Sequence, residues 1–475
     1  MATQSKLSPI DPDAIKAVRN AKLPRRPFWT AMFRLILQHT FTSGVAVALA
    51  PFVIIKNIFP FLRAHPLWSF KTGTMVELTR IFIYCMGVIR FCPVPNKENG
   101  WRETSIFAPI LQLLTFSSAG GAIIADKKTQ QRLKIKAKRL DRVWFNPPPV
   151  DMLRGIISVR VPNKEDQVVR SPRYHGRPLI APEWAKSRCK AYWYMRSAGV
   201  IPPQPSDTEA RRRPVLLYIH GGAGVSFQAG DMFMGDCLAK NLARTAGIDV
   251  FTVDYDLAPY ARYPTTCLQA LGAWLYLVRD LRYDPSQVYI GGDSYGAFST
   301  LTLNRWMRDV LPLLDQTEFG GKPVATPGLI LLSPWLHNDD EGQLFPSRKN
   351  NTKYDIINLN YGKWGTDGLG TGPKYIKTLP LPTSDPWLSL INMDQVEIAE
   401  LPPLFVGNGG AETLLDEGKT LVEKARKAGV HAEHVVAPGQ AHDFYTAPSE
   451  VPVAKGHYRR MKLWIAEVEA KKAKA

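Results

Sequence analysis

The second half of the chain contains a series of short apolar runs, each bounded by turn-forming residues. Runs of this length, rich in β-branched residues, are typical of strands that are buried on both faces of a sheet. Two longer segments between them, residues 265–281 and 295–306, have helical spacing. Strands that alternate with helices predict an α/β fold with a mostly parallel sheet covered by helices. The predicted strands are residues 214–219, 249–255, 287–290, 328–332, 403–406 and 432–436.

This regular pattern extends over residues 211–470, which we interpret as the catalytic domain, and residues 143–210 as a connecting segment with early strands. Residues 339–387 interrupt the pattern and are rich in Gly, Pro, Asn and Lys. A segment of this length is unusual for a plain connection, so we expect an insertion over the carboxyl edge of the sheet. Active-site lids are commonly built from such insertions.

The first half of the chain has a different pattern. Residues 35–55 contain no Asp, Glu, Lys or Arg, and as a helix with a rise of about 1.5 Å per residue they are long enough to cross a bilayer. Gln38 and His39 weaken the hydropathy, and Pro51 would bend the helix. We predict an uncleaved membrane anchor after a basic segment, residues 1–34. A buried core helix and a cleaved signal peptide are the alternatives, although thirty-four residues precede the run.

The basic residues around this anchor predict an orientation. Lys and Arg are more numerous before residue 35 than shortly after residue 55, so the positive-inside rule keeps the N-terminus cytoplasmic. The catalytic domain would then lie in the lumen of the endoplasmic reticulum, where the sequon Asn350-Asn351-Thr352 is available for glycosylation.

Residues 56–142 are expected to form membrane-associated or cap helices. Within them, residues 75–94 are apolar but carry Glu77, Arg80 and Arg90, which favours an interfacial helix. Residues 104–125 are uncharged, and a second crossing there would return the catalytic domain to the cytosol. The topology therefore has two alternatives.

Composition narrows the function classes. The mean hydropathy of −0.15 excludes a polytopic transporter. The net charge of +18 is compatible with nucleic acid, but the basic run at residues 127–142 lacks interleaved aromatic residues, which favours a solvated or membrane-facing helix. Five scattered cysteines form neither a disulfide framework nor a CxxC metal site, although one bridge in an oxidising compartment stays open.

The first chemical motif is Gly292-Asp293-Ser294-Tyr295-Gly296, a G-x-S-x-G between a predicted strand and a predicted helix. A serine at such a turn is exposed as a nucleophile, and the helix N-terminus is directed at a developing oxyanion. The alternative is an ordinary glycine-rich turn. The strand–turn–helix context favours the nucleophile.

The second motif is His220-Gly221-Gly222-Ala223-Gly224, also at a strand end. Acyl transfer requires backbone N–H donors close to the tetrahedral oxygen, and glycines permit that approach. We expect the amides of Gly222 and Ala223, with that of Tyr295, to form an oxyanion hole, and His220 to brace the loop. A phosphate-binding loop is less consistent, because no Gly-Lys-Ser/Thr follows.

The third motif is Gly439-Gln440-Ala441-His442-Asp443-Phe444, in a loop after the last predicted strand. His442 is placed to serve as general base for Ser294 and then as general acid for the leaving group. A solvated loop histidine is the alternative.

HGGA, DYDLAP, GDSYG and GQAHDF together resemble the hormone-sensitive lipase group of α/β-hydrolases, which includes arylacetamide deacetylases and steryl acetyl hydrolases. The resemblance covers residues 211–470, and the N-terminal anchor also resembles that of the membrane-bound members. It implies an α/β-hydrolase fold with Ser294 as nucleophile and His442 as base, and it places the oxyanion motif on Gly221, Gly222 and Ala223. This chain has Asp256 and Tyr260 where the group usually has Arg and Glu, so the internal ion pairing of that loop must differ.

The acid of the triad is also implied by the resemblance. The group places an Asp four residues before a second Asp that is followed by Glu, and the matching stretch runs from Glu412 to Asp416-Glu417. The acid would therefore be Glu412, which has one methylene more than Asp, with Asp416 as the alternative.

These motifs predict a membrane-anchored serine ester hydrolase that needs neither metal nor organic cofactor. The resemblance and the apolar anchor suggest lipophilic short-acyl esters, such as acetylated sterols, as substrates. Three alternatives stay open. An amidase or a transacylase would use the same residues, and a catalytically silent receptor for a small ligand would share the fold. A nucleic-acid scaffold is favoured only by the net charge. The oligomeric state stays open.

Overall fold

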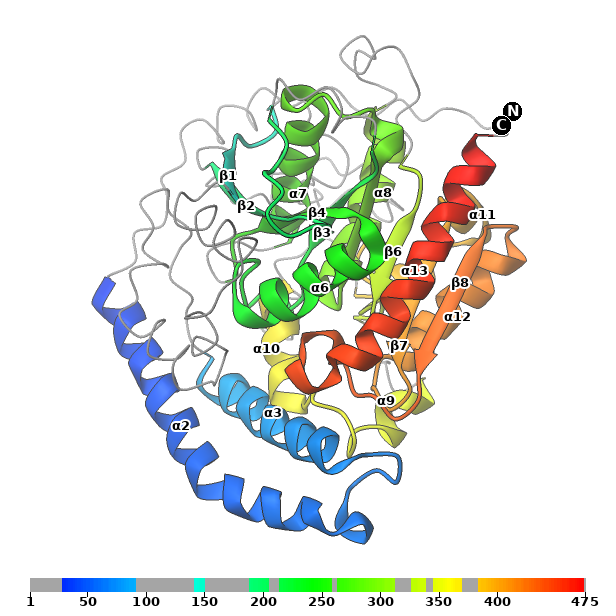
Figure 1. Ribbon diagram of the computed structural model, residues 1–475. Helices are drawn as coiled ribbons and strands as arrows, with labels where there is room; N and C mark the ends of the chain where they lie inside the picture. Colours follow the sequence, from blue (N-terminus) through cyan, green and yellow to red (C-terminus); the bar gives the residue numbers. More distant parts are fainter. Residues whose placement is uncertain are drawn as a thin grey trace, which may run out of the picture.

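The computed structural model describes residues 28–90, 141–149, 188–204, 213–258, 263–311, 326–338, 345–369 and 383–473. Its described strands form one twisted eight-stranded sheet in the order β1-β2-β4-β3-β5-β6-β7-β8 (Figure 1). The strands are β1 (Arg142–Phe145), β2 (Cys189–Tyr194), β3 (Val215–Ile219), β4 (Asp249–Asp254), β5 (Val288–Asp293), β6 (Leu329–Leu332), β7 (Leu404–Gly409) and β8 (Ala432–Ala437).

The sheet is mostly parallel, which confirms the predicted fold class. β3 to β8 pair in parallel, whereas β2 pairs antiparallel with both β1 and β4. All six strands predicted after residue 211 are present within a few residues of the expected bounds. Because parallel strands end at the same edge, the loops after β3, β5, β7 and β8 meet there.

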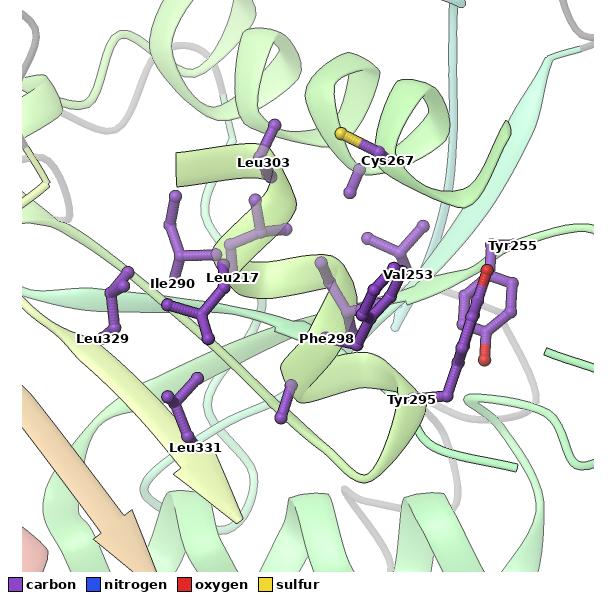
Figure 2. Packing of buried hydrophobic residues seen from close by; sticks show 14 of the residues in the cluster. Leu217, Val253, Tyr255, Cys267, Ile290, Tyr295, Phe298, Leu303, Leu329 and Leu331 are labelled. Carbon is purple, nitrogen blue, oxygen red and sulfur yellow. The ribbon is translucent and has the colours of Figure 1, made fainter. Parts of the chain in front are cut away.

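Helices cover both faces of the sheet, and alternate strand residues divide between the two layers. One layer contains α7 (Thr265–Leu275, continued by η9, Tyr276–Asp280), α8 (Tyr295–Val310) and α12 (Leu415–Lys427). Figure 2 shows Leu217 and Ile290 packed near Phe298 of α8 in this layer. The opposite layer contains η7 (Met232–Ala239), α6 (Lys240–Leu242), η8 (Ala243–Gly247) and α13 (Val451–Lys472).

An N-terminal pair of helices lies outside these layers. α2 (Phe28–Ile58) contains the predicted anchor and extends beyond it at both ends, and α3 (Phe70–Ile89) follows after the short η1 (Pro60–Leu62). The two helices run side by side, with α3 between α2 and α10 (Figure 1). The uncharged segment at residues 104–125 and residues 127–140 of the basic run lie outside the described residues, so the second crossing and the basic helix stay predictions.

Two short helices belong to the insertion that follows β6. They are α9 (Pro346–Asn350) and α10 (Leu359–Leu369). α10 packs against α3, and Gly87 of α3 is so close that an added Cβ would lie 2.7 Å from the backbone nitrogen of Tyr361. The remaining short elements are η10 (Pro285–Gln287), η14 (Leu390–Asn392), α11 (Gln395–Ala399), η15 (Phe444–Thr446) and η16 (Pro448–Glu450).

Candidate active site

Ser294 occupies the sharp turn between β5 and α8, as the G-x-S-x-G pattern predicts. Its backbone has φ 52° and ψ −117°, a conformation that costs a residue other than glycine about 1–3 kcal/mol. The flanking glycines are required sterically: a Cβ on Gly296 would lie 1.9 Å from the carbonyl oxygen of Ile219. The strained turn therefore lies directly against the end of β3.

His442 lies beside this serine. Its Nε2 is 3.0 Å from Ser294 Oγ, and both residues are buried. The loop after β8 is held in place from the insertion, because the backbone N–H of His442 donates to Asp355 Oδ1 at 2.8 Å. The second oxygen of Asp355 accepts from the amide and the hydroxyl of Thr413, beside Glu412. One buried carboxylate thus ties together the loops that carry the predicted base and the predicted acid.

The structure places Glu412, and not Asp416, at the imidazole. Glu412 is fully buried, and its Oε2 lies 3.6 Å from His442 Nδ1. Asp416 instead accepts a hydrogen bond from the backbone N–H of Ser347 at 2.7 Å. Asp416 attaches α9 to the start of α12.

A chain of polar side chains holds the Glu412 carboxylate. Ser333 Oγ donates to Oε2 at 2.6 Å, and Asn408 Nδ2 donates to Oε1. Asn408 Oδ1 in turn lies 2.9 Å from Nε2 of His434. Burial lowers the pKa of His434 to about 4, so this imidazole is neutral at pH 7. Sequence reasoning did not find Ser333 or Asn408, because single polar residues at strand ends have no distinguishing spacing.

The glycine loop after β3 lies against the nucleophile turn. Gly222 and Ala223 have positive φ values of 98° and 55°. The Gly221 N–H donates to Asp293 Oδ2 at 2.9 Å, so the prediction that includes Gly221 in the oxyanion hole is corrected. Asp293 is the last residue of β5 and is buried, so its side chain requires hydrogen-bond donors. The Gly221 amide supplies one of them and thereby holds the loop against β5. Gly222, Ala223 and Tyr295 stay as the predicted oxyanion donors.

Aromatic residues brace the same loop. His220 stacks on Tyr255 with 4.2 Å between ring centroids, and the Tyr255 hydroxyl donates to the His220 carbonyl at 2.8 Å. Figure 2 shows Tyr255 beside Tyr295. His220 is therefore packed on Tyr255 at the start of the glycine loop, a position consistent with the predicted bracing role. Asp256, at the usual Arg position of the group, exchanges two hydrogen bonds with Gln269, while Tyr260 lies outside the described residues.

α10 covers the outer side of the glycine loop. The Tyr361 hydroxyl lies 2.7 Å from Ser226 Oγ, and a Cβ on Gly365 would lie 2.9 Å from the Cβ of Ala223. The helix therefore rests on the predicted oxyanion loop without an intervening side chain. This placement agrees with the expectation that the insertion lies over the carboxyl edge of the sheet.

Opposing influences act on the pKa of His442. Burial alone would lower this pKa, but the carboxylates of Asp443 and Glu412 raise it well above its usual value of 6.5. Burial raises the pKa of Glu412, partly offset by its hydrogen bonds and by His442. The two carboxylates therefore stabilise the imidazolium, which is the charge that acyl transfer creates on its base.

Within the described ranges, no group of three or more His, Cys, Asp or Glu side chains is arranged to hold a metal ion. The four described cysteines, Cys85, Cys189, Cys237 and Cys267, are buried and form no disulfide with one another, and Cys92 lies outside the described residues.

The chain is similar in sequence to proteins of a known family. The family described as alpha/beta hydrolase fold matches residues 216–446. An esterase of Acinetobacter venetianus is 31% identical over 266 residues, which are 55% of this chain and 77% of the esterase. The ethyl acetate hydrolase of Pseudomonas putida is 29% identical over 245 residues, 50% of this chain and 69% of the hydrolase.

Solved structures include an esterase of the bacterial hormone-sensitive lipase family, 26% identical with a TM-score of 0.43, over 58% of this chain and 80% of that one. The family match at residues 216–446 covers the strained serine turn, the glycine loop and the post-strand histidine. The chain therefore belongs to the α/β-hydrolase fold family and is a carboxylic ester hydrolase.

Proposed function

We propose that this chain hydrolyses lipophilic short-acyl esters, such as acetylated sterols, through an acyl-enzyme on Ser294. The observation that carries the proposal is the 3.0 Å contact between His442 Nε2 and Ser294 Oγ on a strained turn. That contact allows direct transfer of the serine proton to the imidazole.

In the acylation step, His442 Nε2 takes the hydroxyl proton while Ser294 Oγ attacks the ester carbonyl carbon. The carbonyl oxygen becomes an oxyanion, for which the amides of Gly222, Ala223 and Tyr295 are the proposed donors. Glu412 orients the imidazole and stabilises its positive charge. The imidazolium then gives its proton to the departing alkoxide. The products of this step are the free alcohol and an acyl-enzyme.

Deacylation repeats this chemistry with water as nucleophile. His442 takes a proton from water as the water oxygen attacks the acyl carbon, and the tetrahedral oxyanion meets the same amides. Collapse breaks the bond to Ser294 Oγ, and the imidazolium returns its proton to the serine. The carboxylic acid leaves and the resting enzyme is regenerated.

Two lines of support bear on the substrate. An ethyl acetate hydrolase and acetyl esterases of Salmonella are among the relatives, which favours a short acyl group. α2 has many exposed apolar side chains, among them Val47 and Phe52 at 74% and 71% exposure. A lipophilic alcohol would concentrate in the bilayer next to such a helix.

We extend the proposal to membrane attachment through α2. Two described helices are long and apolar enough to cross a bilayer, at Thr40–Ile58 and Phe70–Ile89, and 11% and 39% of these windows are buried. α3 contacts the insertion with one face, so α2 is the better candidate for the anchor. The basic flank before α2 favours a lumenal catalytic domain, and Asn350 of the sequon is exposed at the end of α9.

The catalytic proposal is tested with purified full-length protein. Hydrolysis of aryl acetates and of a sterol acetate should disappear in Ser294→Ala, by about 10⁴-fold or more in kcat, while the Tm is retained. A fluorophosphonate should label the wild type and not the variant. Labelling without turnover of any ester would instead favour a receptor, an amidase or a transacylase, and retained hydrolysis in Ser294→Ala would refute the mechanism.

The membrane proposal is tested by protease protection of intact microsomes. A lumenal domain should be digested only after detergent, and Asn350→Gln should remove any endoglycosidase-sensitive mass. Digestion of the domain without detergent would overturn the lumenal assignment in favour of a two-crossing or peripheral arrangement. Release of the full chain by carbonate would exclude an integral anchor.

A further inference from the structure

A second carboxylate touches the imidazole at the nitrogen that faces the nucleophile. Asp443 Oδ2 lies 3.0 Å from His442 Nε2, the same nitrogen that lies 3.0 Å from Ser294 Oγ. Asp443 is 6% exposed, and its Oδ1 has no hydrogen-bond partner among the described residues. A triad needs one carboxylate at Nδ1, so this contact has no place in the mechanism above.

The backbone of Asp443 produces this contact. Its φ of 47° and ψ of 36° lie in the left-handed region, which aspartate adopts more readily than most residues but which still requires support. The support is local: the Asp443 N–H donates to Ser333 Oγ, and its carbonyl accepts from the amide and the hydroxyl of Thr446. The loop thus turns the side chain back onto the preceding residue.

The contact is attractive in one protonation state of the imidazole. A neutral imidazole that accepts the Ser294 proton has a lone pair on Nε2, and a carboxylate 3.0 Å away is repelled by it. An imidazolium has a proton on Nε2 and can share it between the serine and Asp443. Asp443 is therefore placed to stabilise the state that follows proton transfer.

Other acidic groups face His442 from the elements packed around it. Glu412 comes from the connection between β7 and α12, and Asp293 from the end of β5. Asp355, from the insertion, accepts the backbone N–H of His442. Of these described carboxylates, Glu412 and Asp443 form ion-pair contacts with the ring, and Asp443 alone does so at Nε2.

We propose that Asp443 is a second carboxylate partner of His442, which stabilises the imidazolium from the nucleophile side and sets the pH at which the enzyme becomes active. The inference rests on the proposed serine mechanism. Because the base must be neutral to accept the serine proton, a stabilised imidazolium moves the acidic limb of the pH profile to higher pH. The same stabilisation lowers the barrier of acylation once substrate is bound.

The test is the pH dependence of kcat/KM for an aryl acetate in full-length wild type, Asp443→Asn and Asp443→Gly. Loss of the carboxylate should move the acidic limb to lower pH by about one unit or more, and kcat on the plateau should fall several-fold. Glycine is the second variant because it adopts the positive φ without strain, so a folding defect in one variant leaves the other. Asp416→Asn, which removes a charge without touching the imidazole, should leave the limb in place.

The rate of fluorophosphonate labelling of Ser294 against pH gives the same limb without substrate turnover. Equal shifts in labelling and hydrolysis would support the role of Asp443. An unmoved limb in both Asp443 variants, with Ser294-dependent hydrolysis retained, would overturn it and leave the serine mechanism intact. Wild-type protein that is neither labelled nor active at any pH would overturn the serine mechanism and this inference together.

Discussion

The Glu412→Gln substitution tests the triad with the smallest change of shape. The side chain is fully buried and accepts hydrogen bonds from Ser333 and Asn408. Glutamine fills the same volume, and burial already raises the pKa of Glu412, so the native charge is itself costly to bury. We therefore expect the variant to fold with a Tm close to that of the wild type.

The hydrogen bonds around Glu412 determine how glutamine must sit. Asn408 presents its NH₂ group to Oε1, because its Oδ1 faces Nε2 of His434 at 2.9 Å. The glutamine oxygen must occupy the Oε1 position to accept from Asn408, which leaves the glutamine NH₂ at the position 3.6 Å from His442 Nδ1. A donor there favours the imidazole tautomer with its proton on Nε2. That tautomer cannot accept the Ser294 proton.

The expected loss follows from the wrong tautomer. Replacing a triad carboxylate by its amide lowers kcat by about 10⁴-fold in a serine protease, and a loss of about 10³- to 10⁴-fold is expected here. This corresponds to about 4–5.5 kcal/mol of transition-state stabilisation. Steady-state hydrolysis of an aryl acetate at saturating substrate measures kcat, with the Tm measured on the same samples.

Asp416→Asn is the matched control, since it neutralises the neighbouring carboxylate that attaches α9 to α12. It should reduce kcat by less than about tenfold. A large loss in Asp416→Asn with near-normal Glu412→Gln would refute the assignment of the acid. Comparable small losses in both would mean that neither carboxylate orients His442 during turnover.

Two further substitutions test the elements around the site. In Gly365→Val the added Cβ would lie 2.9 Å from the Cβ of Ala223. Overpacking of about 1–3 kcal/mol should therefore displace α10 or the glycine loop and lower kcat/KM by about tenfold or more. Gly362→Val is the control, because a Cβ there meets open space on the same helix, and it should leave kcat/KM unchanged. Equal kcat/KM values for the two variants would contradict the close packing of Gly365 against the loop. Glu417→Gln removes the charge of the buried carboxylate that pairs with Arg348 and should lower the free energy of unfolding by about 1–3 kcal/mol. A thermal-shift assay measures the effect, with Glu423→Gln at an exposed position as the control. An unchanged Tm in Glu417→Gln would contradict the expectation.

Hydrophobic patterning predicted the parallel part of the sheet well. A strand buried on both faces must be apolar at nearly every position, and the runs at 215–219 and 329–332 have that pattern. β1 and β2 were expected only as early strands in a connecting segment, without bounds. Residues 189–194 read CKAYWY, and Lys190 within this strand is buried against Asp254, so the tertiary ion pair that permits the strand is invisible in the local pattern.

The candidate site was predictable to the extent that its chemistry is local. The turn at Ser294 and the glycine loop are each formed by consecutive residues, so the types and order of those residues are sufficient to predict both. Asp293, Asn408 and Asp355 act on residues from 4 to 87 positions away, and no spacing connects them before folding. Asp443 was within the third motif, but its contact with Nε2 depends on a backbone conformation that the motif does not specify.

The connection between α2 and α3 contacts the loop that carries His442. Trp68, between α2 and α3, is buried and donates from Nε1 to the carbonyl of Gly439 at 2.6 Å, three residues before His442. Trp68→Phe keeps the ring contacts but leaves a buried carbonyl unsatisfied, at a cost of about 1–3 kcal/mol. The loop should then shift until the Gly439 carbonyl meets another donor, and kcat and the labelling rate of Ser294 should fall about five- to tenfold. Leu67→Ala, at a 65% exposed position of the same turn, is the control. A lower Tm with unchanged kcat would mean that Trp68 only stabilises the fold and that the helices do not position His442.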